Sequence, residues 1–229
     1  SAQVNILTLE DPVEYRIVGV NQVQINTQAG LTFASGLRSF LRQDPNIIMV
    51  GEIRDTETTD LAIQASLTGH LVFSTLHTND ASGSLPRLLD MKAESYLIAS
   101  TVTCVAGQRV VRQICPTCRI SKIPQKEIVE KMKEVLDGLF DFEKNKNLKL
   151  FEGRGCKECN NTGYLGRIGI FEILVVSEKI AKMIIVRSRA QEIAKQAVSE
   201  GMITMRQDGF LKVLEGITTV EEVLRVAEE

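Results

Sequence analysis

The sequence predicts an α/β fold built on a parallel sheet, followed by a cysteine-rich insert and a helical carboxy-terminal part. Two short apolar runs, at residues 47–50 and 71–76, are typical of parallel strands that are covered on both faces. Segments with helical periodicity, at 33–43 and 56–68, alternate with these strands. Two Cys-x-x-Cys pairs further along the chain mark the insert.

Composition limits the class of protein. The chain has 229 residues, of which 44% are hydrophobic, so one or two domains with a real core are expected. A formal net charge of -2 gives no electrostatic case for nucleic acid or an acidic membrane surface as the main partner. No apolar run approaches the roughly 18 residues of a membrane-spanning helix, and the amino terminus does not have the pattern of a secretory signal.

The first elements of the sheet follow in order. Residues 4–9 predict a strand that ends at Glu10, and it starts so early that we expect residue 1 to lie partway along a longer protein. Alternating polar and apolar residues over 20–26 predict a half-exposed strand. The helix expected over 33–43 stops before Asp44-Pro45.

The later elements are less regular. The helix over 56–68 is expected to end at Gly69, and residues 80–112 read as mostly helical. An amphipathic helix is expected between the cysteine pairs, with one packed stripe and one solvated face. That stripe consists of Ile128, Met132, Val135, Leu136 and Leu139.

Residues 167–174 return to strand, and the tail reads as short helices. Ser177 and Thr219 suit helix N-caps, and Thr219 with Glu222 fits a capping box. The predicted domains are therefore residues 1–114, an insert over 115–163, and a carboxy-terminal part over 164–229.

The two cysteine pairs predict a structural metal site. The four ligands would be Cys115, Cys118, Cys156 and Cys159. Each pair places two sulfurs on one tight turn, and four thiolates form a closed tetrahedral site of the kind that holds zinc. A redox centre would need one pair rather than two, and disulfides are rare in a reducing compartment. We therefore expect zinc at the base of the insert, and Cys104, in an apolar stretch, to be a plain buried thiol.

Acidic and imidazole side chains follow three of the expected strands. Glu10 and Asp11 end the first, Glu52 follows the run 47–50, and His77 follows the run 71–76. Because ligands of parallel sheets bind at the carboxyl ends of the strands, these groups are expected at one edge. A carboxylate at that edge can hold Mg²⁺ directly or through water. The alternatives are that Glu52 only pairs with Arg54 and that His77 is a satisfied core or cap residue.

Several arginines are candidates for contacts with phosphate. Arg38 and Arg42 lie four residues apart on one helical face, and Arg54 follows Glu52. They could be solvated, or some could cross a subunit interface to neutralise phosphate charge. The phosphate-binding loop that would complete such a site, GxxxxGK[ST], does not occur in the 229 residues.

These motifs resemble those of the type II secretion and type IV pilus assembly ATPase family. Residues 8–15, TLEDPVEY, resemble its aspartate box, and residues 47–52, IIMVGE, resemble its Walker B segment. Residues 69–80, GHLVFSTLHTND, resemble its histidine box. The paired cysteines, with the segment 160–167 after them, are similar to its tetracysteine module. The resemblance covers essentially the whole chain and depends on four motifs in the family's order.

The resemblance implies a RecA-like sheet of the P-loop NTPase type, truncated at its front. It implies a cytoplasmic homo-hexamer, peripheral at the inner membrane, that uses ATP and Mg²⁺ to drive pilus assembly or protein secretion through an inner-membrane platform protein. Glu10 would be the general base or orient the water, with Asp11 supporting it, and Glu52 would act at Mg²⁺. His77, and less surely His70, would sense the γ-phosphate.

The same resemblance makes Arg38, Arg42 and Arg54 phosphate or interface residues, with Arg87 a weaker candidate. Retraction-type relatives usually lack the tetracysteine module, so an assembly or secretion motor is favoured. The segment alone is expected to hydrolyse little ATP. Two other interpretations remain open: a zinc-stapled interaction module without hydrolytic activity, and a nucleic-acid motor, against which the absence of a basic stripe counts.

Overall fold

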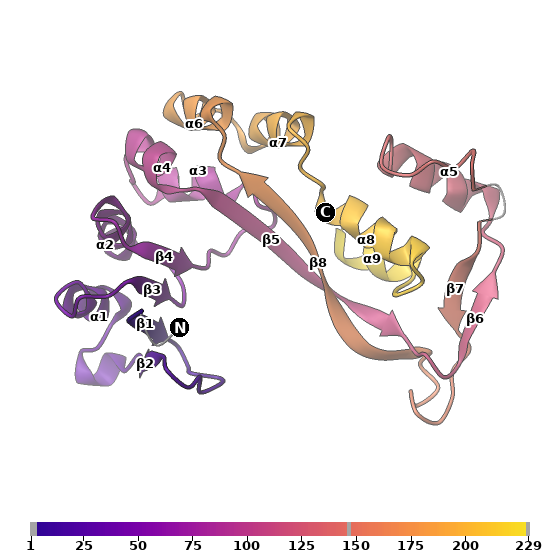
Figure 1. Ribbon diagram of the computed structural model, residues 1–229, viewed down its shortest axis with the longest axis horizontal. Helices are drawn as coiled ribbons and strands as arrows, with labels where there is room; N and C mark the ends of the chain where they lie inside the picture. Colours follow the sequence, from indigo (N-terminus) through magenta and orange to yellow (C-terminus); the bar gives the residue numbers. More distant parts are fainter. Residues whose placement is uncertain (1–3, 146–147, 228–229) are drawn as a thin grey trace. The chain divides into compact units, whose positions relative to one another are not determined.

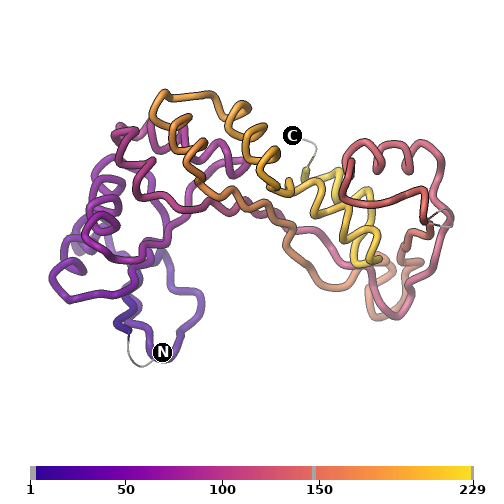
Figure 2. Tube along the Cα trace, turned by 45° about the horizontal axis from the view of Figure 1, so that its top comes forward, coloured from indigo at the N-terminus to yellow at the C-terminus, as the bar shows by residue number. Residues whose placement is uncertain are grey.

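The computed structural model describes residues 4–145 and 148–227, and the chain divides into two compact units (Figures 1 and 2). The first unit contains Ser1–Val105 and Val175–Ala197, and the second contains Ala106–Leu174 and Val198–Glu229. The units do not follow the three consecutive segments expected from the sequence. The second unit joins most of the insert to the carboxy-terminal helices, because helix α5 (Lys126–Val135) of the insert packs on helix α8 (Met205–Leu214) of the tail.

The first unit contains a four-stranded parallel sheet with strand order β2-β1-β3-β4. Its strands are β1 (Ile6–Glu10), β2 (Asn21–Gln24), β3 (Ile47–Val50) and β4 (Leu71–Ser74). Helix α1 (Phe33–Phe40) leads into β3, and helix α2 (Thr56–Leu67) joins β3 to β4. This confirms the alternation of strands and helices predicted for residues 4–76.

The core of the first unit lies where α1 covers the two central strands. Leu9 on β1 and Leu37 on α1 are fully buried. A Cβ atom added at Gly36 would lie 2.5 Å from a methyl group of Leu9, so a larger residue there would force the Leu9 side chain to move. Each large side chain buried here contributes about 1.5–3 kcal/mol relative to an exposed one.

Side-chain caps fix where the two helices begin. Thr32 and Ser35 form a capping box at the start of α1, with the Thr32 hydroxyl accepting from the Ser35 amide at 3.2 Å. The Asp55 carboxylate accepts from the Thr58 amide at 2.8 Å at the start of α2. Such caps contribute about 0.5–2 kcal/mol each, and they set the path by which the chain leaves the sheet after β3.

Strand β4 corrects one expectation. Its apolar run was predicted to be covered on both faces, but Leu71 and Phe73 are 50% and 54% exposed in the part of the chain that the structure describes. In the sheet that the described residues form, β4 is the edge strand next to β3, and an edge strand has fewer neighbours to cover its side chains than a central one.

The segment 80–112 also differs from its prediction. Helices α3 (Ser84–Asp90) and α4 (Ser95–Thr101) form as expected, but Cys104–Ile114 is a long strand, β5, rather than a helix. It pairs with β8 (Tyr164–Val175), so a partner distant in sequence decides its conformation. Cys104, at its start, is exposed, and the expectation of a buried thiol is wrong.

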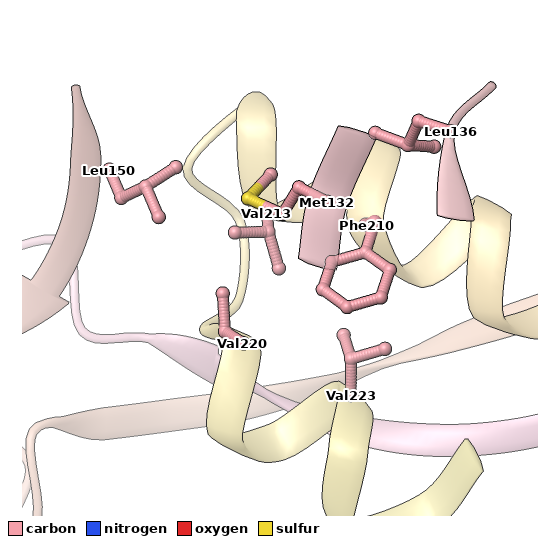
Figure 3. Packing of buried hydrophobic residues seen from close by; sticks show 7 residues of the cluster. All are labelled: Met132, Leu136, Leu150, Phe210, Val213, Val220 and Val223. Atoms are coloured by element: carbon pink, nitrogen blue, oxygen red, sulfur yellow. The ribbon is translucent and has the colours of Figure 1, made fainter. Parts of the chain in front are cut away.

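The second unit carries a hydrophobic cluster between the insert and the tail (Figure 3). Helix α5 (Lys126–Val135) packs on α8 (Met205–Leu214), which packs on α9 (Val220–Ala227). Met132, Leu136 and Phe210 are fully buried there. The predicted stripe of the insert helix is thus packed, except that Leu139, beyond the end of the helix, is 41% exposed.

The remaining elements complete both units. Strands β6 (Arg119–Lys122) and β7 (Leu150–Gly153) form an antiparallel pair in the second unit. Helix α6 (Glu178–Ile185) begins at Ser177, which caps it as predicted, and α7 (Ala190–Ser199) follows. None of the helices in the described residues combines the length and apolarity needed to cross a bilayer.

Candidate functional site

Three strand ends bring the predicted acidic and imidazole groups to one edge of the parallel sheet. Glu10 is the last residue of β1, while Glu52 and His77 lie just beyond β3 and β4. The Gly51 amide donates to the Leu9 carbonyl at 2.7 Å, which continues the pairing of β3 with β1 past the end of β3. A Cβ atom at Gly51 would lie 2.9 Å from that carbonyl oxygen, so the close approach requires glycine.

Glu52 is the centre of a charged cluster at this edge. Its Oε2 accepts from His77 Nε2 at 2.9 Å and from Arg54 Nε. Burial raises the pKa of Glu52, but the hydrogen bonds from His77 and Arg54 outweigh burial and hold that pKa below its usual value. The Glu52 side chain is 13% exposed, whereas His77 is 76% exposed. The pair is therefore a fixed carboxylate beside an accessible imidazole.

Glu10 is held separately, on β1. Its side chain is nearly buried, and its Oε1 accepts from Gln22 Nε2 at 2.9 Å and from the Thr8 hydroxyl. Asp11, the next residue, is exposed. Sequence reasoning missed Gln22 and Thr8, whose roles depend on the register of β1 with β2.

The candidate arginines fall into two groups. Arg54 belongs to the Glu52 cluster, whereas Arg38 pairs with Glu57 and so joins α1 to α2. Arg42 donates to the Arg38 carbonyl at 2.8 Å. Arg87 is an exposed residue in the last turn of α3. The side chains of Arg38 and Arg42 thus contact residues of the helices rather than groups at the sheet edge.

His70 lies at the opposite end of β4 from His77. Its Nδ1 is 2.8 Å from the Ala65 carbonyl oxygen and 3.0 Å from the Thr68 hydroxyl. The ring therefore covers the carboxyl end of α2, where helix carbonyls lack intrahelical partners. This placement gives His70 a structural contact and separates it from the Glu52 cluster.

The four predicted cysteines come together in the second unit. Their sulfur atoms all lie within 4.8 Å of one another, with Sγ···Sγ distances of 3.8 Å for Cys115–Cys156, 3.9 Å for Cys118–Cys159 and 3.7 Å for Cys156–Cys159. Thiolates at the corners of a tetrahedron with metal–sulfur bonds of about 2.3 Å are separated by about 3.8 Å. The cluster can therefore hold a metal ion, with cysteine as every protein ligand.

Backbone amides point at the sulfurs. The amides of Cys156 and Gly163 donate to Cys159 Sγ at 3.2 and 3.3 Å, and the Gly155 amide donates to Cys118 Sγ at 3.3 Å. Burial raises the pKa of Cys159, but its two amide donors outweigh burial and lower the pKa to about 6. Burial and hydrogen bonds to the neighbouring thiols raise the pKa of Cys118 to about 12, so it is at Cys159 that the backbone favours the thiolate form needed for metal ligation.

Two glycines let the strands close around the cysteines. A Cβ atom at Gly153 would lie 2.0 Å from the Gly163 carbonyl oxygen, and a Cβ at Gly163 would lie 2.4 Å from the Gly153 carbonyl oxygen. Gly163 also has a positive φ of 77° and accepts from the Cys115 amide at 2.9 Å. This contact joins the turn of the second cysteine pair to the first.

Comparison with solved structures identifies chains that share the fold. The pilus retraction motor PilT with bound ADP superposes with a TM-score of 0.68 at 24% identity, covering 99% of this chain and 53% of that one. The Legionella pneumophila ATPase DotB superposes with a TM-score of 0.64 at 23% identity, covering 99% of this chain and 52% of that one. At this identity the likeness concerns the fold alone.

Sequence comparison then identifies the family. The family described as "Type II/IV secretion system protein" matches residues 1–225, and the chain belongs to it. The resemblance found in the four sequence motifs is therefore confirmed.

Two curated relatives have high identity to this chain. A type IV pilus assembly ATPase PilB of Thermus thermophilus is 50% identical over 220 residues, which are 96% of this chain and 24% of the relative. A type II secretion system protein E of Pseudomonas aeruginosa is 48% identical over 225 residues, 98% of this chain and 43% of the relative. The chain thus spans less than half the length of these relatives.

Proposed function

We propose that this chain provides the carboxylate, histidine and arginine side of an ATP-hydrolysing site in a motor for type IV pilus assembly or type II secretion. The observation that carries the proposal is the convergence of Glu10, Glu52 and His77 at the carboxyl ends of adjacent parallel strands, with Glu52 and His77 in direct contact. Ligands of open parallel sheets bind at this edge. The names of the relatives support the reaction.

The side chains suit a division of roles. Glu10 would orient or deprotonate the attacking water, and Asp11 would support it from its exposed position. Glu52, ionised and held by Arg54 and His77, would hold Mg²⁺ or its water shell, and the bound ion would neutralise phosphate charge. His77 is exposed and would reach the γ-phosphate.

The arginines would act at the same phosphates. Arg54 already lies beside Glu52, while Arg38 on α1 and Arg42 just after it are exposed and could reach the site of a neighbouring subunit. In this proposal the intact protein is a cytoplasmic homo-hexamer that works at the inner membrane on a platform protein. The phosphate-binding loop, which is not among these 229 residues, would come from another segment of the longer protein.

The metal of the cysteine cluster is proposed to be zinc. Four thiolates at tetrahedral spacing select zinc among ions without redox chemistry, and a site closed by four protein ligands is structural. Its place in the proposal is to hold the two cysteine turns of the insert together while the sheet edge of the first unit carries the chemistry.

Steady-state ATP hydrolysis by the full-length parent protein tests the proposed site. Glu10→Gln and Glu52→Gln are each expected to reduce kcat by at least about 100-fold, because each removes a charge used in the transition state. Glu57→Gln, which changes a glutamate on α2 that pairs with Arg38, is the matched control and should keep near-normal activity. Near-normal turnover by both site variants would contradict the proposal and favour an interaction module. The 229-residue segment alone is expected to show negligible turnover.

A further inference from the structure

We propose that Gln22 is a positioning residue for Glu10, and that it acts together with Thr8. The inference rests on the proposed function of Glu10 and adds a residue that no motif in the sequence singled out. It begins with strand register: in the parallel pair of β1 and β2, Thr8 lies opposite Gln22. Glu10 lies two residues after Thr8, so its side chain leaves the same face of the sheet. The register of the two strands therefore makes the three side chains neighbours.

The hydrogen bonds of this trio all end on one oxygen. Gln22 Nε2 donates to Glu10 Oε1 at 2.9 Å, and the Thr8 hydroxyl donates to the same Oε1. Neither donor occupies Oε2, the oxygen that would face a water molecule. A carboxylate held in this way cannot rotate without losing both bonds. Its second oxygen is thus fixed in direction, which is what orienting a nucleophile requires.

Backbone contacts fix Gln22 itself. Its Oε1 accepts from the Ile17 amide at 2.6 Å, and its Nε2 also donates to the Tyr15 carbonyl at 3.0 Å. The reversed amide would place oxygen against the Tyr15 carbonyl and the Glu10 carboxylate, and NH₂ against the Ile17 amide. The orientation is therefore determined by three groups, of which Glu10 is one.

The same contacts connect Glu10 to the loop between β1 and β2. Tyr15, Ile17 and Val18 of that loop are 81%, 59% and 102% exposed, so packing does little to hold it. Gln22 ties the loop backbone at two points and the carboxylate at a third. Gln24, two residues further on β2, also contacts the loop, because its Oε1 accepts from the Val13 amide at 3.3 Å. Among the hydrogen bonds of the described residues, none joins the Gln24 side chain to the Glu10 carboxylate.

The difference between Gln22 and Gln24 gives a matched experiment on ATP hydrolysis by the full-length parent protein. Gln22→Met keeps the side-chain length and removes the donor, and we expect kcat to fall about 10- to 100-fold with KM for ATP unchanged, as for loss of a hydrogen bond to a charged group. Gln24→Met should change kcat less than about twofold. Equal effects of the two variants would overturn the inference, because only a general effect on the loop would then remain.

A double substitution distinguishes positioning from a general structural role. If Gln22 acts through Glu10, adding Gln22→Met to Glu10→Gln should lower kcat less than about twofold further, since the group that it positions is already lost. A full additional loss in the double variant would overturn the inference. Near-normal turnover by Glu10→Gln alone would instead contradict the proposed role of Glu10, so the two failures can be told apart.

Thr8 provides a second measurement if Gln22→Met fails to fold. Thr8→Ser keeps the hydroxyl that donates to Oε1 and should retain near-normal kcat, whereas Thr8→Val keeps the shape and should lose about tenfold. Equal activity of these two variants would contradict the inference that donors on Oε1 matter. Thermal unfolding of each variant provides the check that the first unit remains folded.

Discussion

The cysteine cluster and the sheet edge are two sites of opposite character in one chain. In the cluster, four ligands face one another, Cys115 and Cys159 are almost fully buried, and backbone amides bind the sulfurs. At the sheet edge, the Glu52 carboxylate is held tightly, but His77 and Arg54 are 76% and 67% exposed. The comparison shows that a structural site can be complete within a segment of a protein, whereas the proposed catalytic site is one side of a larger arrangement.

Metal removal should give the largest effect and should separate the two regions. Chelation, or Cys156→Ser, is expected to release about one metal ion per chain and to unfold the surroundings of β6 and β7, because the free energy of zinc binding to such sites is about 10–16 kcal/mol. Metal analysis with hydrogen exchange measures both effects, and peptides from β1 and β3 should keep their protection. Cys104→Ser changes a cysteine outside the cluster and is the control. A fully reduced sample without metal and with a well-ordered insert would contradict this expectation.

The buried carboxylate of Glu222 should give a smaller effect in the same unit. Its side chain is 2% exposed and accepts from Arg112 Nη2 at 2.6 Å and from Arg225 Nη2 at 2.9 Å. We expect Glu222→Gln to lower the free energy of unfolding by about 2 kcal/mol, because it replaces charge-assisted hydrogen bonds with weaker ones. Chemical denaturation measures this, and Glu221→Gln, in the same helical turn, should change little.

The pH dependence of this contribution has a definite sign. Burial raises the pKa of Glu222, but the hydrogen bonds from Arg225 and Arg112 outweigh burial and lower the pKa from 4.5 to about 2. Because the folded form binds the proton more weakly than the unfolded form, the stabilisation is fully present above pH 4.5 and is lost as the pH falls towards 2. The stability difference between Glu222→Gln and the unchanged protein should shrink over that interval. A constant difference would show that the carboxylate charge is not what matters.

The ion pair of Arg38 and Glu57 should give the smallest effect on stability. Both side chains are more than half exposed, and such pairs contribute about 0–1 kcal/mol. Arg38→Ala and Glu57→Ala are therefore expected to lower the free energy of unfolding by less than about 1 kcal/mol each. If Arg38 serves phosphate across a subunit interface, only Arg38→Ala should reduce ATP hydrolysis by the parent protein. Equal activities would leave Arg38 as a surface residue of α1.

Local patterns predicted the parts of the molecule that depend on local chemistry. The spacing of the cysteines was sufficient to predict that Cys115, Cys118, Cys156 and Cys159 meet, because two tight turns bring four sulfurs together. The strand–helix alternation up to β4 was sufficient to place Glu10, Glu52 and His77 at one edge. The prediction for the sheet edge required only that neighbouring strands be parallel.

The missed features depend on partners distant in the chain. Cys104–Ile114 became a strand because it pairs with β8, and Glu222, expected only as part of a capping box, is also the buried partner of Arg112 on β5. Gln22 looked like an exposed residue of an alternating strand, and its contact with Glu10 follows from a register that the sequence does not state. Pairing between distant segments therefore determined these features, which local sequence propensity does not predict.

The close approach of Gly153 and Gly163 has a consequence for sequence variation. The backbone at each glycine occupies the space where a side chain at the other would begin. A larger residue at either position would therefore displace the facing backbone, and larger residues at both positions would add two clashes. A second substitution at the facing glycine would therefore not relieve the clash caused by the first. In a saturation mutagenesis experiment, these two glycines should therefore be intolerant positions alongside the four cysteines, although glycine offers no side-chain atom to a metal.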